Sequence, residues 1–176
     1  MKMHPHLQST RDAIDKATDG ITSEQLSWHP DGKWCTAEVL EHLALAFGGS
    51  AKLLARVAND GKSAATASTF KQLFRTWVVT KREFLPGGRT APAIVTPRGM
   101  ASDQVLLTIR KNLADMDQAI TACESKLGAK IKVADHPILG PLTVTQWRKF
   151  HLVHTRHHMK QIDALRAQIK NAQSKS

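Results

Sequence analysis

Four histidines crowd into one stretch of eight residues near the end of the chain: His151, His154, His157 and His158. Nine histidines placed at random over 176 residues would put only about 0.4 in such a window, so the stretch is enriched about tenfold. On a helix, His154 and His158 stand one turn apart and about 40° around the axis, with Cβ atoms roughly 5–6 Å from each other. Two imidazoles at that spacing can bind one metal ion, each at roughly 2.0–2.1 Å.

The helix that carries this pair has its apolar side chains on the same stripe as the two histidines. Trp147, Ile162 and Leu165 fall within that arc, so both imidazoles should point into the core. Buried imidazole nitrogens need partners, and a metal ion supplies one for each ring. Hydrogen bonds inside an ordinary core are the alternative. His151 lies one turn before His154, so the pair His151/His154 is a rival ligand set that spacing does not exclude.

His42 supplies a third candidate ligand from a distant part of the sequence. It shares a helix face with Val39, Leu43 and Ala46, which predicts that it too points inward. A lone inward histidine is more often a hydrogen-bonded core residue than a ligand. Together with the later pair, however, it would complete a set of three histidines, an arrangement that leaves coordination positions open for water or substrate.

Other side chains near these histidines have both a chemical and a structural interpretation. Cys35 lies at the start of a predicted helix, where a thiolate is acidified, but a small buried hydrophobe is the commoner role. Gln161, one turn after His158, can hydrogen-bond a ligand ring or serve the core. His136 can reach the rim of a pocket, although we expect it, like His29, to be a plain loop residue.

Composition and motifs exclude several other functions. The net charge is +10, but the basic residues are scattered, and the sequence has no arginine-rich run, zinc-finger spacing or aromatic RNA-binding signature. We therefore expect a solvated basic surface rather than a nucleic-acid partner. The sequence shows no Ser/His/Asp arrangement and no phosphate-binding glycine loop. Thr155 follows His154 where a zinc protease motif would have glutamate.

The cysteine count and the hydropathy of the chain bear on its compartment. Two cysteines, Cys35 and Cys123, do not make a disulfide framework and favour a reducing environment. The first residues lack the apolar core of a secretory signal, and no stretch approaches the roughly 18 apolar residues of a membrane span. We therefore expect a cytoplasmic protein without membrane contact.

Helical periodicity dominates the sequence, and its start and stop signals predict where the helices lie. A single short turn is expected after Thr22, and segments 60–68, 89–99 and 131–142 read as linkers or loops rich in glycine, proline or polar residues. The predicted helices run from Pro5 to Gly20, from a Thr36 cap to about Asn59, from Thr69 to near Pro86-Gly87-Gly88, from a Ser102-Asp103 cap to Gly128, and from a Thr143 cap to Ile169.

Four long helices, with connections long enough to cross the bundle ends, favour an all-α four-helix bundle. We expect one domain over residues 1–170 and a frayed tail over residues 171–176.

Two segments resemble the DinB-like proteins. Residues 34–43, WCTAEVLEHL, resemble the start of the second helix in that family, where a Trp-Ser/Thr pair precedes a helix with an inward histidine. Residues 136–143, HPILGPLT, followed by Gln146-Trp147 and by HTRHHMKQ at 154–161, resemble the closing motif of a DinB-related subgroup. Together with the helix order between them, these motifs span nearly the whole chain.

The resemblance implies a four-helix bundle that binds a nickel, zinc or iron ion through the histidines that match the family pattern, His42, His154 and His158. It also implies homodimers. Some relatives are S-transferases or isomerases that use a low-molecular-weight thiol such as bacillithiol or mycothiol.

We therefore expect a metal-dependent transferase or hydrolase that acts on a small molecule, by thiol-dependent S-transfer or by metal-assisted hydrolysis. The alternative is a non-catalytic bundle whose basic surface binds an acidic partner or nucleic acid.

Overall fold

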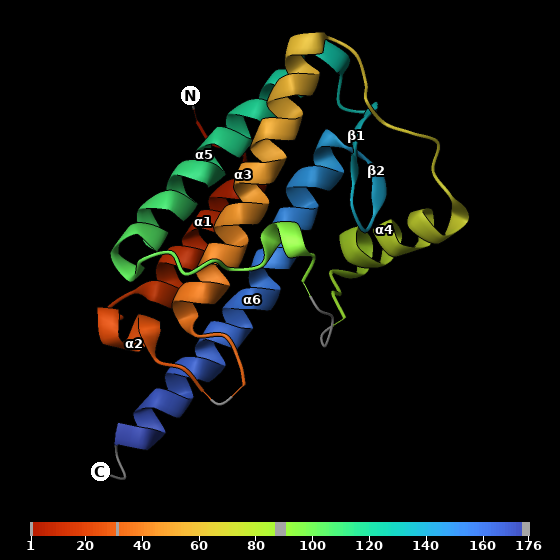
Figure 1. Cartoon of the computed structure of the whole chain (residues 1–176). Coiled ribbons are helices and arrows are strands. Elements are labelled where there is room, and N and C mark those ends of the chain that lie inside the picture. Colours follow the sequence, from red (N-terminus) through yellow and green to blue (C-terminus); the bar gives the residue numbers. More distant parts are fainter. Residues whose placement is uncertain (1, 31, 87–90, 174–176) are drawn as a thin grey trace.

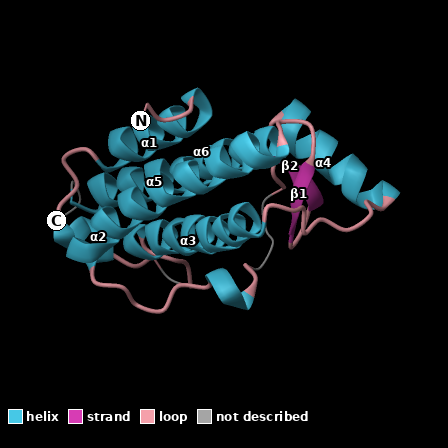
Figure 2. Ribbon diagram, turned by 90° about the horizontal axis from the view of Figure 1, so that it is seen from above, coloured by secondary structure: helices cyan, strands magenta, loops and turns pink. Residues whose placement is uncertain are grey.

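Four long helices run alongside one another in the computed structural model, which describes residues 2–30, 32–86 and 91–173 (Figure 1). Helix α3 packs along α5, and α1 packs along α6 (Figures 1 and 2). In each pair, the two helices bury their apolar stripes against each other. The predicted all-α bundle is confirmed. Its helices are α1 (Pro5–Thr18), α3 (Thr36–Asp60), α5 (Ser102–Leu127) and α6 (Val144–Gln173).

Three shorter elements lie around the bundle. The predicted turn after Thr22 is α2 (Ser23–Ser27), in which Thr22 and Gln25 cap each other's backbone N–H groups. Helix α4 (Phe70–Arg82) lies outside the bundle and packs against α6 and the hairpin described below (Figure 2). A short 3₁₀ turn, η1 (Ala93–Val95), rests on α3.

The expectation of an irregular connection over residues 131–142 is wrong. An antiparallel hairpin forms there from β1 (Lys132–His136) and β2 (Gly140–Thr143). The N–H groups of Ile138 and Leu139 both donate to Nδ1 of His136 at 3.2 Å, and Gly140 adopts a positive φ of 74°. The proline and glycine signals therefore mark a tight turn inside a hairpin whose strands are too short to show alternation.

The hairpin also ties down the linker that precedes α4. The Ala64 N–H donates to the Val133 carbonyl at 3.0 Å, and Thr66 donates to the Asp135 carboxylate from its backbone and its hydroxyl at 3.0 and 2.7 Å. The linker is thus fixed as an extra edge on the hairpin, which positions α4 relative to α6.

Several predicted helix ends shift. The N-cap of α3 is Cys35 rather than Thr36, with its N–H donated to the Glu38 carboxylate at 2.8 Å, and α5 is capped by Ala101 rather than by Ser102-Asp103. Helix α4 ends at Arg82, before Pro86; Gly87, Gly88 and Arg89 lie outside the described residues. Helix α6 extends past Ile169 to Gln173, so residues 171–173, which were expected to belong to a frayed tail, are helical. The rest of the expected tail, residues 174–176, lies outside the described residues.

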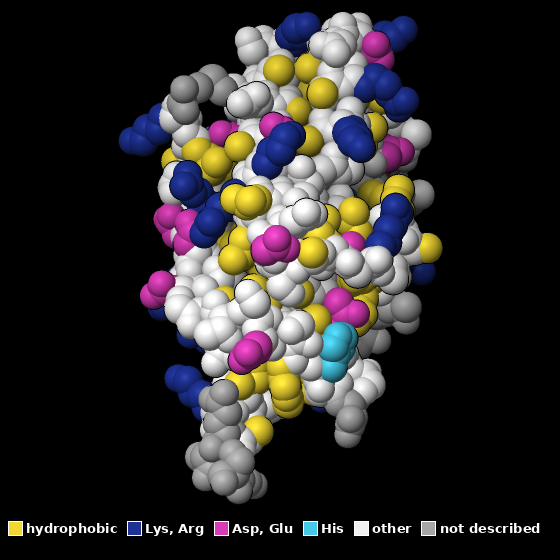
Figure 3. All heavy atoms as spheres, turned by 60° about the vertical axis from the view of Figure 1, so that its left-hand side comes forward, with side chains coloured by type: hydrophobic (Ala, Val, Ile, Leu, Met, Phe, Trp, Pro, Cys, Tyr) yellow, Lys and Arg dark blue, Asp and Glu magenta, His cyan; other side chains and the backbone are white. Residues whose placement is uncertain are grey.

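The surface shows mixed charge on the face drawn in Figure 3, where Lys and Arg side chains are interspersed with Asp and Glu and do not gather in one patch. This is the distribution of a solvated basic surface. Across residues 2–30, 32–86 and 91–173, none of the helices combines the length and hydropathy needed to cross a bilayer.

Candidate metal centre

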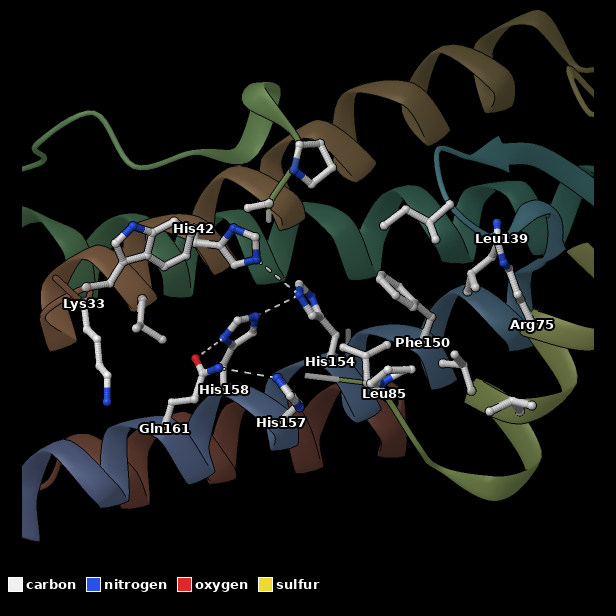
Figure 4. A pocket seen from close by; sticks show the side chains of 18 of the residues that line it. Lys33, His42, Arg75, Leu85, Leu139, Phe150, His154, His157, His158 and Gln161 are labelled. Carbon is white, nitrogen blue, oxygen red and sulfur yellow. Dashed lines mark hydrogen bonds between the residues drawn. The ribbon is translucent and has the colours of Figure 1, made fainter. Parts of the chain in front are cut away.

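Three imidazoles from two helices meet inside the bundle. His42 comes from α3, and His154 and His158 come from α6 (Figure 4). Nε2 of His154 lies 3.2 Å from Nε2 of His42 and 3.0 Å from Nε2 of His158. Two nitrogens bound to one ion at about 2.0–2.1 Å stand roughly 3.0–3.4 Å apart. The spacing therefore suits a shared metal ion.

Hydrogen bonds on the outer side of two rings fix which nitrogen carries the proton. Nδ1–H of His42 donates to the Val95 carbonyl at 2.8 Å, because a carbonyl can only accept. Nδ1–H of His158 donates to the Gln161 amide oxygen, also at 2.8 Å. In a neutral ring this leaves the Nε2 lone pair free, and both lone pairs point toward His154.

His154 cannot satisfy both lone pairs by itself. A neutral imidazole has one N–H, and a single proton on its Nε2 would serve two acceptors while leaving Nδ1 as a buried acceptor. No described residue offers Nδ1 of His154 a hydrogen bond. A cation that accepts all three Nε2 lone pairs removes the conflict at Nε2, so these residues fit a metal ion better than hydrogen bonds alone.

Burial keeps these rings in the neutral form that binds metals. Desolvation lowers the pKa of His158 to about 4 and also lowers the pKa of His42. The pKa of His154 falls well below its ordinary value through desolvation, reinforced by His158 and His42. All three side chains therefore offer lone pairs near neutral pH without first losing a proton.

His42, His154 and His158, referred to below as the triad, lie on the wall of a cavity of about 1040 Å³. Side chains from α3, α4, α6 and the hairpin line it, together with the segments around residues 33 and 91 (Figure 4). Phe150 stacks on His154 with ring centroids 5.3 Å apart and continues the wall toward Leu139. A volume of this size holds a small molecule next to the imidazoles.

The sequence model of the DinB superfamily matches residues 6–162, which include both resembling segments and all three histidines. The chain belongs to the DinB superfamily. No curated protein and no solved structure gave a match to it. Membership in the DinB superfamily and the buried histidine group are together compatible with a metal-binding enzyme.

Glu41 on α3, which supports the three histidines, was not identified from the sequence. Its buried carboxylate accepts the backbone N–H groups of three consecutive residues, at 2.8, 3.1 and 2.9 Å: Arg98, Gly99 and Met100. This clamp fixes the irregular segment that delivers the Val95 carbonyl to His42. The available signal was a carboxylate on the inward side of an apolar helix, directly before His42, which must find donors once it is buried.

The rival pair His151/His154 does not assemble in this DinB bundle. Nε2 of His151 lies 3.1 Å from the Ser50 hydroxyl, and its ring packs against Phe47 and Trp147. The expectation that His136 is a plain loop residue is wrong, because it is the last residue of β1, where its ring accepts the N–H groups of the hairpin turn. Both therefore have structural roles.

Cys35 is buried rather than reactive. Desolvation raises the pKa of its thiol, the opposite of the acidification expected at a helix start. With His29 and Glu38 it forms a second close group, but His29 is an exposed loop residue and the Glu38 carboxylate already accepts the Cys35 N–H. The interpretation of Cys35 as a small buried residue is the better one.

Proposed function

We propose that this DinB chain is a metal-dependent enzyme acting on a small molecule bound in the cavity beside His42, His154 and His158. The observation that carries the proposal is the convergence of three Nε2 atoms on the wall of a large apolar cavity. Neutral imidazoles suit zinc, nickel or iron as the divalent cation. Such a cation supplies charge that polarises a substrate oxygen or stabilises a bound thiolate.

The chain's own residues hold and shield that centre. Val95 and Gln161 keep the Nε2 lone pairs of His42 and His158 directed inward. Phe150 covers one face of His154, and the side chains that line the cavity beside the rings are mostly apolar. A substrate bound there would displace water and meet a lower dielectric, which strengthens any charge interaction with it.

Two reactions fit this arrangement, metal-assisted hydrolysis and thiol-dependent S-transfer. For S-transfer the thiol has to be a second substrate, because Cys35 and Cys123 are both buried and desolvation raises the pKa of each. A low-molecular-weight thiol would serve. Turnover of model electrophiles and esters, each measured with and without added thiol, separates the two reactions.

Metal content tests the proposal directly. Protein purified without a nickel column should contain about one transition-metal ion per chain, and His154→Ala should lose it and lower the melting temperature. His157→Ala is the matched control, since His157 lies on the same helix but outside the converging group. Wild-type protein without stoichiometric metal, combined with a His154→Ala variant of unchanged melting temperature, would overturn the proposal.

A further inference from the structure

The cavity wall is unbalanced in charge. Its described residues include three cations, Lys33, Lys71 and Arg75, and no aspartate or glutamate. Apart from these, the histidines, Gln161 and Gln168, the wall consists of apolar side chains and glycine. An apolar cavity with cations and no acid favours a ligand that is itself mostly apolar and carries negative charge.

Two of the cations lie together on α4. Lys71 and Arg75 are four residues apart and therefore share one face of the helix, with Phe74 and Val78 on the same cavity wall. Like charges at this spacing repel each other. An anion placed between them would turn that repulsion into two attractive contacts.

Neither Lys71 nor Arg75 has a counter-ion elsewhere in the part of the chain that the structure describes. Lys149 and Arg156 on α6 both pair with the Glu83 carboxylate, at 2.5 and 2.9 Å. Arg75 is half-buried and so partly desolvated, which strengthens a bond from its guanidinium to an anion.

The positions of these groups indicate how a ligand would be oriented in the cavity. Arg75 lies near Leu139 at one end of the cavity, and Phe150 lies between it and His154 (Figure 4). A molecule with its anionic group at Arg75 would lay its apolar body over Phe150 and reach the triad with its other end.

We propose that the substrate is an apolar molecule with an anionic group, a carboxylate, phosphate or sulfonate, which Lys71 and Arg75 bind while the apolar body lies along Phe150 toward His154. This inference rests on the proposed function, because it names the substrate class of the same site. Charge-assisted hydrogen bonds from both cations provide the specificity for the anion.

A pair of fluorescent probes tests the inference on the full chain. The two probes are 1-anilinonaphthalene-8-sulfonate and N-phenyl-1-naphthylamine, which share an aromatic scaffold and differ in the sulfonate. The double variant Lys71→Gln/Arg75→Gln should bind the sulfonate at least about tenfold more weakly, as expected for the loss of charge-assisted bonds. Its affinity for the neutral probe should stay within about twofold of wild type.

The matched control is Lys81→Gln/Arg82→Gln, which removes the same charge from the exposed end of the same helix. This control should bind both probes like wild type. Sulfonate binding that is unchanged in the Lys71/Arg75 variant, or weakened equally in the control, would overturn the inference, as would equal loss of the neutral probe.

Metal content of the same samples separates this inference from the proposed function. The Lys71/Arg75 variant should retain the metal of the wild type. Retained metal with unchanged sulfonate binding defeats only the anion site, whereas wild-type protein without metal but with the expected probe selectivity defeats only the metal-dependent function.

Discussion

The three histidines of the candidate centre are held in different ways. His42 and His158 each donate Nδ1–H to an oxygen, whereas His154 is oriented by its stack on Phe150 and by the two rings beside it. Ligand rings whose outer N–H is fixed lose less freedom on binding and offer a more basic lone pair. Removal of such an outer partner should therefore weaken metal binding without removing a ligand.

Gln161→Leu tests this at His158. The leucine cannot accept the Nδ1–H, so we expect metal affinity to fall by roughly 10–100-fold, the range for lost outer partners of metal-bound histidines. Competition with a chromophoric chelator measures the change. Gln168→Leu, two turns further along α6 and also on the cavity wall, is the control and should keep wild-type affinity. Equal affinities in both variants would contradict a role for Gln161 at the centre.

The sequence predicted part of this constellation for a clear reason. Helical periodicity places His154, His158 and Gln161 on one stripe, so their mutual approach follows from spacing alone. Val95 could not be predicted, because its contribution is a backbone carbonyl in an irregular segment, and neither its side chain nor any periodicity marks it. Long-range contacts of that kind depend on how a loop crosses the bundle.

Among the elements, the loop that crosses α3 depends on one side chain. Glu41 binds three consecutive backbone N–H groups after η1 and thereby holds Val95 against His42. A buried carboxylate with three donors is satisfied only while the loop stays in place. Loss of the Glu41 contacts should therefore destabilise both the segment after η1 and the start of α3.

Glu41→Gln should lower the free energy of unfolding by about 2–4 kcal/mol, since an amide replaces charge-assisted bonds worth about 1.5–3 kcal/mol each and turns an N–H₂ toward backbone donors. Urea unfolding measures the loss, and hydrogen exchange at residues 98–100 should speed up. Glu38→Gln, whose carboxylate accepts the Cys35 N–H at the start of α3, is the milder control. A Glu41→Gln variant as stable as that control would refute the clamp.

The helices could be predicted because apolar stripes and caps are local sequence features. The hairpin could not be predicted, because long-range contacts hold it. Its strands are held by the turn at His136 and by the linker around Thr66, which lies 69 residues before Asp135 in sequence. The apolar side chains of α4 also show that local periodicity does not determine which face of a helix is buried. Phe70, Leu73, Phe74 and Trp77 look like a core face in sequence but are each at least 49% exposed. Homodimer formation stays a prediction.

For the whole molecule, buried neutral histidines make stability depend on pH. Burial lowers the pKa of His151 to about 3 and that of His136 to about 4. Below pH 6.5 the unfolded chain therefore binds protons that the folded chain does not, and the free energy of unfolding falls as pH falls toward 4. Each such proton contributes a slope of about 1.4 kcal/mol per pH unit.

Urea unfolding of chelator-treated protein at pH 7, 5.5 and 4.5 should show this decline. His151→Gln should reduce the slope between pH 5.5 and 4.5 by about 1.4 kcal/mol per pH unit, since one proton no longer distinguishes the two states. Parallel pH profiles for the variant and wild type would show that His151 does not contribute.

The cavity is assembled from two parts with separate tasks. The long helices α3 and α6 carry the imidazoles, while α4 and the hairpin, which stand outside the bundle, carry Lys71, Arg75 and Leu139. Mutations in the outer wall can therefore change which compounds are accepted while the reaction chemistry is preserved. Laboratory evolution of new selectivity should therefore begin on α4 and the hairpin rather than on the bundle.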